Sequence, residues 1–190
     1  MNDLFTKIVT EIFEFRSEPD DIVNPFTMAR QFGIVTAEAD FSGYPKLKGK
    51  LGFHKIEVED EGVYKHIICY KSDIDPVWKP FILAHELGHF FMYTKGIEEL
   101  PKVSIIANAF PENNSIDESD LNEKELVCNK FAREMLMPAN KFRSLVKHYL
   151  ALGAYERSTR EMIIARLLAN DFEVPFNHAY LRAQELGVYA

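Results

Sequence analysis

A strongly apolar segment, residues 81–91, carries the motif His-Glu-x-x-His at His85, Glu86 and His89. If this segment is an α-helix, the two histidines lie one turn apart on the same face. Apolar residues surround the motif on nearly every side, so the helix must be buried. Burying two imidazoles and a carboxylate without partners is costly. A Zn²⁺ ion bound by His85 and His89 supplies that partner, and Glu86 is then placed to act as a general base.

The alternative for this segment is a pair of core histidines that are hydrogen-bonded to backbone carbonyl groups. The two interpretations differ in what they require elsewhere in the chain. A catalytic zinc site usually has three protein ligands and one open position, so the metal interpretation needs a third ligand.

Glu125 is the candidate for the third ligand. Asp120 and Glu123 have the spacing of a capping box, which predicts a helix over residues 121–137. Glu125 falls on the apolar stripe of this helix and is therefore predicted to point toward the core, where a carboxylate needs a cation. A His₂Glu set is a known ligand set of catalytic zinc. The other members of the stripe are Leu121, Cys128, Ala132, Met135 and Leu136.

This helix leaves two alternatives open. An arginine such as Arg133 could pair with Glu125 in place of a metal. Cys128, one turn after Glu125, could also reach a metal, but we predict a small core residue. By the same spacing, the face predicted to be exposed to solvent comprises Glu123, Val127, Lys130 and Glu134.

Charge and composition limit the classes of function. The chain has 190 residues, a formal net charge of −7 and a pI near 5.4, which argues against non-specific binding to nucleic acid or to an anionic membrane. Its apolar runs are too short to span a membrane, and its first residues lack the pattern of a signal peptide. Cys69 and Cys128 lie in apolar surroundings and are predicted to be free thiols. We therefore expect a cytoplasmic protein.

The rest of the chain predicts an α+β fold. We expect a small antiparallel sheet packed on the His-Glu-x-x-His helix, followed by a helical C-terminal region, with residues 97–120 forming a long connection. The expected division is a zinc domain of residues 1–138 and a C-terminal helical subdomain of residues 139–190 packed on it. Strands are expected at residues 34–36, 51–58 and 63–70, the last two as a hairpin, and the other helices at 3–16, 24–33, 141–152, around 162–168 and 177–186.

The last two predicted helices look like a helix-turn-helix unit. A version that reads DNA needs basic and amide residues on its second helix. This helix offers Asn177, His178, Arg182 and Gln184, but also Glu185, in an acidic protein. We therefore favour packing under the core, or docking of a protein partner, over DNA binding.

The motifs of this sequence resemble those of a known family. Residues 81–89 are similar to the Ala-His-Glu-Leu-Gly-His signature of the ImmA/IrrE metallo-endopeptidases, and residues 125–138 resemble the second motif of that family. The second motif runs Glu-x-x-Ala-Asn-x-Phe-Ala and ends in Leu-Met-Pro, and Cys128 stands here where the family usually has Ala. Phe172 to Gly187 resembles the C-terminal helix pair of the family. The resemblance is sharp over residues 78–138 and looser elsewhere.

The resemblance implies a role for each motif residue. His85 and His89 match the zinc-binding histidines, Glu86 the general base and Glu125 the third zinc ligand. It also implies a zinc-dependent endopeptidase in the cytoplasm of a bacterium or from a phage. The partner it implies is a helix-turn-helix repressor, whose cleavage releases repressed genes of a mobile element or a stress response.

Several roles are left open by the sequence. Tyr93 and His148 are candidates for a residue that stabilises the transition state. His54 and His66, on predicted strands, are expected to be surface or rim residues, with metal binding as the alternative. Two other functions also fit: a non-catalytic zinc or protein-binding module that acts by contact with a repressor, and a DNA-binding regulator that uses the C-terminal helices.

Overall fold

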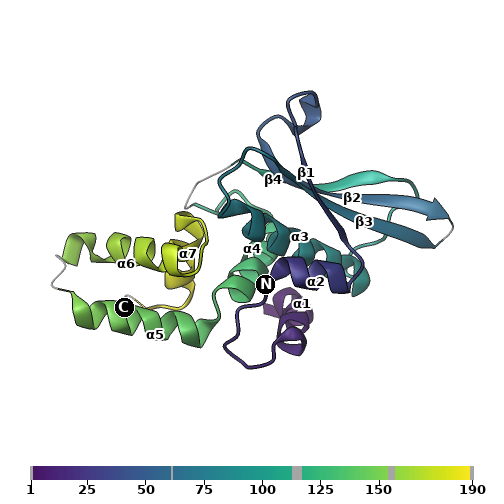
Figure 1. Ribbon diagram of the computed structural model, residues 1–190. Coiled ribbons are helices and arrows are strands. Elements are labelled where there is room, and N and C mark those ends of the chain that lie inside the picture. The colour runs from purple at the N-terminus through teal and green to yellow at the C-terminus, as the bar shows by residue number, and fades with distance from the viewer. Residues whose placement is uncertain (1, 61, 113–116, 154–156, 189–190) are drawn as a thin grey trace.

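The computed structural model describes residues 2–60, 62–112, 117–153 and 157–188 (Figure 1). Over these residues the fold is α+β, as the sequence predicts. The helices are α1 (Asn2–Phe15), α2 (Pro25–Gln31), α3 (Trp78–Thr94), α4 (Glu123–Leu136), α5 (Ala139–Leu152), α6 (Arg157–Asp171) and α7 (Phe176–Glu185). The strands are β1 (Val35–Ala39), β2 (Lys50–Asp60), β3 (Val63–Lys71) and β4 (Ile105–Pro111), and a short 3₁₀ turn covers Pro45–Leu47.

The four strands form one sheet in the order β1-β3-β2-β4. The predicted hairpin of β2 and β3 is confirmed as an antiparallel pair, although Glu61 of its turn lies outside the described residues. The expectation of a purely antiparallel sheet is wrong, because β1 pairs parallel with β3. β1 and β2 are consecutive in the sequence but are not neighbours in the sheet, because β3 lies between them. β4 was not predicted: it lies within residues 97–120 and pairs antiparallel with β2 at the sheet edge.

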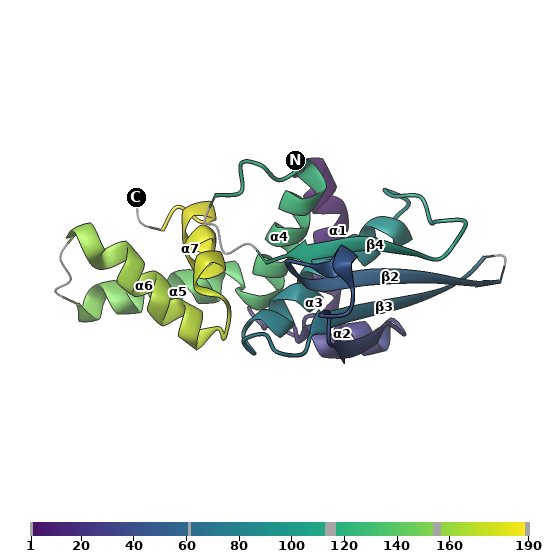
Figure 2. The ribbon, with the colours of Figure 1, turned by 90° about the horizontal axis from the view of Figure 1, so that it is seen from above.

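Helix α3 is the centre of the molecule. It packs against β2, β3 and β4 of the sheet and against α1, α2 and α4 (Figures 1 and 2). Its residues from Phe81 to Met92 are all buried, as the all-round apolar sequence predicts. The motif histidines are therefore held inside the protein by contacts on every side of their helix.

A glycine on α3 allows α4 to approach closely. A Cβ atom at Gly88 would lie 3.1 Å from the Sγ atom and 3.2 Å from the Cα atom of Cys128. Contacts this short are tighter than ordinary van der Waals packing, so a larger residue would push the helices apart. This close approach brings the stripe of α4, with Glu125, beside the motif. Cys128 is a buried free thiol, as predicted.

Two details of α4 differ from the predictions. Its N-cap is Asn122, whose side chain accepts a hydrogen bond of 3.1 Å from the backbone N–H of Glu125, so the predicted capping box at Asp120 is wrong. The predicted solvent face is also wrong in part, because Val127 and Glu134 are buried. The carboxylate of Glu134 accepts hydrogen bonds from Arg16 of the α1–α2 connection and from Arg182 of α7, which explains why it can be buried.

The C-terminal helices extend to one side of this core. α5 and α6 pack on each other, and α7 contacts both α6 and α4 (Figures 1 and 2). The Nε atom of Arg182 donates a hydrogen bond of 3.1 Å to the carbonyl oxygen of Met137, which ties α7 to the end of α4. The division into residues 1–138 and 139–190 stays a prediction. Among the described residues, no helix combines the length and the apolar character that crossing a membrane requires.

Candidate metal centre

Three predicted site residues converge between α3 and α4. The Nε2 atoms of His85 and His89 lie 3.2 Å apart. The two oxygens of Glu125 lie 3.2 Å from Nε2 of His85 and 3.3 Å from Nε2 of His89. Among the described residues, this is the group of histidine, cysteine and carboxylate side chains that could hold a metal ion with three or more ligands.

The spacing of these atoms fits a tetrahedral zinc ion. Zinc lies about 2.0–2.2 Å from its nitrogen and oxygen ligands, so two ligands of a tetrahedral site are about 3.3–3.6 Å apart. The two Nε2 atoms lie 3.2 Å apart, Oε2 of Glu125 lies 3.2 Å from His85 and Oε1 lies 3.3 Å from His89, at or just below this range. With one ligand atom taken from each residue, the three atoms lie within 4.8 Å of one another. His85, His89 and Glu125 could therefore hold one ion, with a fourth position free for water or a substrate.

The ring orientation of His85 is fixed by a chain of hydrogen bonds. Its Nδ1 atom lies 2.9 Å from Oδ1 of Asn129, an acceptor, so Nδ1 carries the proton and the lone pair of Nε2 is available to a metal. The Nδ2 atom of Asn129 in turn donates to Oε1 of Glu118 at 2.7 Å. Asn129 lies one turn after Glu125 on the same face of α4. Its helical spacing from Glu125 was a signal in the sequence, but no role was predicted for Asn129.

A buried arginine holds Glu118 in place. Arg133 is fully buried and donates to Glu118 at 2.9 Å and 3.0 Å. It also donates to Glu185 of α7, at 2.7 Å and 3.0 Å. Arg133 therefore does not pair with Glu125, which was the alternative to a metal. It connects the segment before α4 to α7 and supports the residues around His85.

Glu86 has the environment of a poised base. It is fully buried, and both of its carboxylate oxygens are without a hydrogen-bond partner among the described residues. The pKa of Glu86 is raised to about 7 as the net result of burial, which raises it most, of the neighbouring His89, which lowers it, and of Glu125, which raises it. Burying a carboxylate without a partner costs free energy. Its presence beside a set of possible metal ligands therefore points to a role in the chemistry of that site.

The environment of Glu125, unlike that of Glu86, favours the ionised carboxylate. Burial by itself raises its pKa, but hydrogen bonds and charge interactions with His85 and His89 outweigh burial and lower the pKa below the ordinary value. The two carboxylates of the site thus differ in environment: Glu125 is stabilised as an anion that can bind a cation, and Glu86 is closer to its protonated form.

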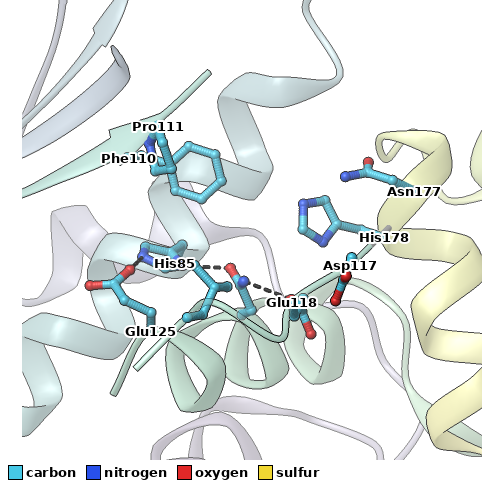
Figure 3. A pocket seen from close by; sticks show the side chains of 10 residues that line it. His85, Phe110, Pro111, Asp117, Glu118, Glu125, Asn177 and His178 are labelled. Carbon is cyan, nitrogen blue, oxygen red and sulfur yellow. Dashed lines mark hydrogen bonds and ion pairs between the residues drawn. The ribbon is translucent and has the colours of Figure 1, made fainter. Parts of the chain in front are cut away.

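A cavity opens beside His85 and Glu125 (Figure 3). One wall comes from the end of β4, through Phe110 and Pro111, and the opposite wall comes from α7, through Asn177 and His178. The ring of Phe110 lies edge-on to that of His85, with 4.8 Å between centroids. The remaining lining residues are Asp117, Glu118, Leu121 and Asn129.

The other candidate residues do not line this cavity, although Tyr93 lies close enough to Glu86 for the two groups to interact electrostatically. The Tyr93 hydroxyl is hydrogen-bonded to Glu98 and Asn108, and its ring lies against His54. His148 is exposed on α5, outside the lining of the cavity. The expectation that His54 is a surface residue is wrong: it is fully buried, with its Nε2 atom 2.9 Å from Nδ1 of His66.

The predicted DNA-reading residues of α7 mostly face the protein. Asn177, His178 and Arg182 are buried, so these side chains are not available to a DNA groove, whereas Gln184 is exposed. The ring of His178 stacks on Phe81 of α3 with 3.6 Å between centroids. Asn177 and His178 line the cavity, a role that could not be predicted from the sequence because it depends on where α7 packs.

Comparison with known proteins supports a family assignment. The family model Peptidase_M78, described as the IrrE N-terminal-like domain, matches residues 29–184. The match begins in α2 and ends in α7, so it covers the sheet, the metal-ligand cluster and both walls of the cavity. A search among curated proteins finds no match.

Proposed function

We propose that this chain, which belongs to the Peptidase_M78 family of IrrE N-terminal-like domains, is a zinc-dependent endopeptidase. Membership supports a peptidase, and the His85, His89 and Glu125 cluster supports a bound metal ion. The observation that carries the proposal is the cluster of His85, His89 and Glu125, whose ligand atoms lie within 4.8 Å of one another, with Glu86 buried beside it. This arrangement puts a possible site for one divalent ion beside Glu86, whose carboxylate oxygens have no hydrogen-bond partner among the described residues.

Each residue of the site has a role in hydrolysis. His85, His89 and Glu125 would hold zinc, whose Lewis acidity makes a bound water more acidic and a peptide carbonyl more electrophilic. Glu86 takes a proton from the attacking water on a carboxylate oxygen and transfers it to the leaving amine nitrogen. Its carboxylate is buried and has no hydrogen-bond partner among the described residues, so it is available to accept and release that proton. Asn129 keeps Nδ1 of His85 protonated, so that Nε2 faces the ligand position.

The edge of the sheet offers a path for the substrate. β4 is an edge strand, so the backbone groups of its outer side are not paired within the sheet. The strand ends at Phe110 and Pro111, which line the cavity beside His85. An extended peptide that adds to β4 as a further strand would therefore run past the metal ligands.

We further propose that the physiological substrate is a helix-turn-helix transcriptional repressor in the cytoplasm. Support comes from the resemblance of residues 81–89 and 125–138 to the ImmA/IrrE motifs. Cleavage would relieve repression of genes of a mobile element or a stress response. The exposed edge strand is compatible with this substrate if the cleaved segment is extended or can unfold locally.

The proposal is tested by measuring the zinc content and the peptide cleavage of the wild type and of site variants. We expect about one zinc per chain in the wild type and in Glu86→Gln, and loss of zinc in His85→Ala and Glu125→Ala. A peptide library analysed by mass spectrometry should be cleaved by the zinc-loaded wild type but not by Glu86→Gln, because Gln cannot take the proton. Full cleavage by Glu86→Gln would refute the mechanism. Zinc binding without cleavage, together with repressor binding that survives Glu86→Gln, would favour a non-catalytic module.

A further inference from the structure

The wall of the cavity formed by α7 carries a buried polar group without a partner. Asn177 is 5% exposed, and its Nδ2 atom has no hydrogen-bond partner among the described residues. Asn177 lines the cavity that also contains His85 and Glu125, and Figure 3 shows its amide reaching from α7 toward that cavity. A buried unpaired donor costs free energy in the unbound protein, so its position favours a ligand that supplies the acceptor.

The donor that α7 offers to this cavity is the side chain of Asn177. α7 begins at Phe176. Pro175 and Phe176 line a separate cavity, together with Asp75, Val77 and Trp78, whereas Asn177 lines both cavities. A ligand in the cavity beside His85 therefore meets the amide of Asn177 rather than the residues that begin α7.

Neighbouring contacts hold this wall rigid. His178 follows Asn177 directly, and its ring stacks on Phe81 of the metal-ligand helix. The same ring lies edge-on to Trp78, with 5.6 Å between centroids. Arg133 holds the other end of α7 through Glu185. The Asn177 amide is therefore fixed relative to the metal ligands before any substrate binds, which reduces the entropic cost of binding.

We propose that Asn177 is a substrate-binding residue whose Nδ2–H donates to a backbone carbonyl oxygen of the peptide, on the side of the scissile bond that faces α7. A backbone carbonyl is the acceptor that every peptide supplies, whatever its side chains. In this arrangement β4 binds one side of the extended substrate and α7 binds the other. The inference rests on the proposed peptidase function.

Two probes separate this contact from the metal site. Acetohydroxamate binds a metal ion but has no peptide backbone. A pool of phosphinic pseudo-tetrapeptides with randomised side chains binds the metal and also carries backbone carbonyls on both sides of the phosphinic group. Affinities are measured by calorimetry on the zinc-loaded wild type, on Asn177→Ala and on Asn177→Asp. Gln184→Ala is the matched control, because Gln184 is an exposed amide on the same helix.

We expect Asn177→Ala to weaken binding of the pseudo-peptide pool about tenfold, the effect of one lost hydrogen bond in a buried site. Asn177→Asp should weaken it at least as much, because it replaces the donor by an acceptor. Affinity for acetohydroxamate should stay unchanged in both variants, which also shows that they are folded and loaded with zinc. The melting temperature of Asn177→Ala should not fall, because the lost donor has no partner in the free protein.

Three outcomes would overturn the inference. Equal affinity of the wild type and Asn177→Ala for the pool would exclude the contact. A wild type that binds the pool no more tightly than acetohydroxamate would show that α7 does not bind backbone. Equal weakening of both probes would indicate a structural role. Failure of the wild type to bind zinc or acetohydroxamate would instead refute the proposed function.

Discussion

Replacing Asn129 by alanine tests how the fold prepares His85 for a metal. In the wild type, Nδ1 of His85 donates to Oδ1 of Asn129 at 2.9 Å. Asn129→Ala leaves this buried N–H without an acceptor, at a cost of about 1–3 kcal/mol. Because about 1.4 kcal/mol corresponds to a tenfold change in affinity, zinc binding should weaken about 5–150-fold. This range agrees with the roughly 10–100-fold losses that follow removal of groups supporting metal-binding histidines.

The assay is competition for zinc with a chromogenic chelator, which reports affinity without relying on catalysis. Asn129→Asp is the informative companion: it keeps an acceptor for His85 but loses the donor to Glu118, so it should retain zinc far better than Asn129→Ala. Asn170→Ala, at an exposed asparagine of α6, is the control for loss of an amide. If Asn129→Ala binds zinc within about twofold of the wild type, the reasoning is refuted.

Three further predictions concern the stability of the scaffold. Arg133→Met removes the ion pairs of two largely buried carboxylates, so that among the described residues Glu118 keeps only its hydrogen bond from Asn129 and Glu185 only its contact with Arg182. The change should cost about 3 kcal/mol, which lowers the melting temperature by about 6–12 °C. Gly88→Ala adds a methyl group against Cys128 and should destabilise the protein by about 1–3 kcal/mol in urea unfolding. Burial lowers the pKa of His54 from 6.5 to about 3, with a contribution from His66. The unfolded state therefore binds the extra proton first, and about 2 kcal/mol of stability should be lost between pH 7 and pH 5.

The controls for these predictions use the same unfolding experiments. For His54, metal-free wild type and His54→Gln are compared at both pH values, and the variant should lose less stability on acidification. An equal loss in both proteins would contradict a neutral buried histidine. Unchanged melting of Arg133→Met would exclude a stabilising role of its ion pairs. A Gly88→Ala protein as stable as the wild type would show that α3 and α4 can separate at little cost.

The sequence determined which residues form the candidate site and which elements carry them. Local spacing places His85 and His89 on one face of a helix, and the apolar residues around them require that this helix be buried. The same reasoning placed Glu125 on the inner face of its helix, because the helical period is a local property of the chain. The hairpin of β2 and β3 was predictable for the same reason, since its pairing is between neighbours in sequence.

Only the tertiary structure decided what surrounds the site. β4 was hidden in a long connection because its pairing with β2 is non-local, and β1 became parallel because β3 lies between it and β2. Asn177 faces the cavity because α7 is anchored to α4 through Arg133 and Arg182, contacts between residues about 50 positions apart. Such contacts depend on shape and charge over the whole fold, whereas the periodicity of a helix is written in a few consecutive residues.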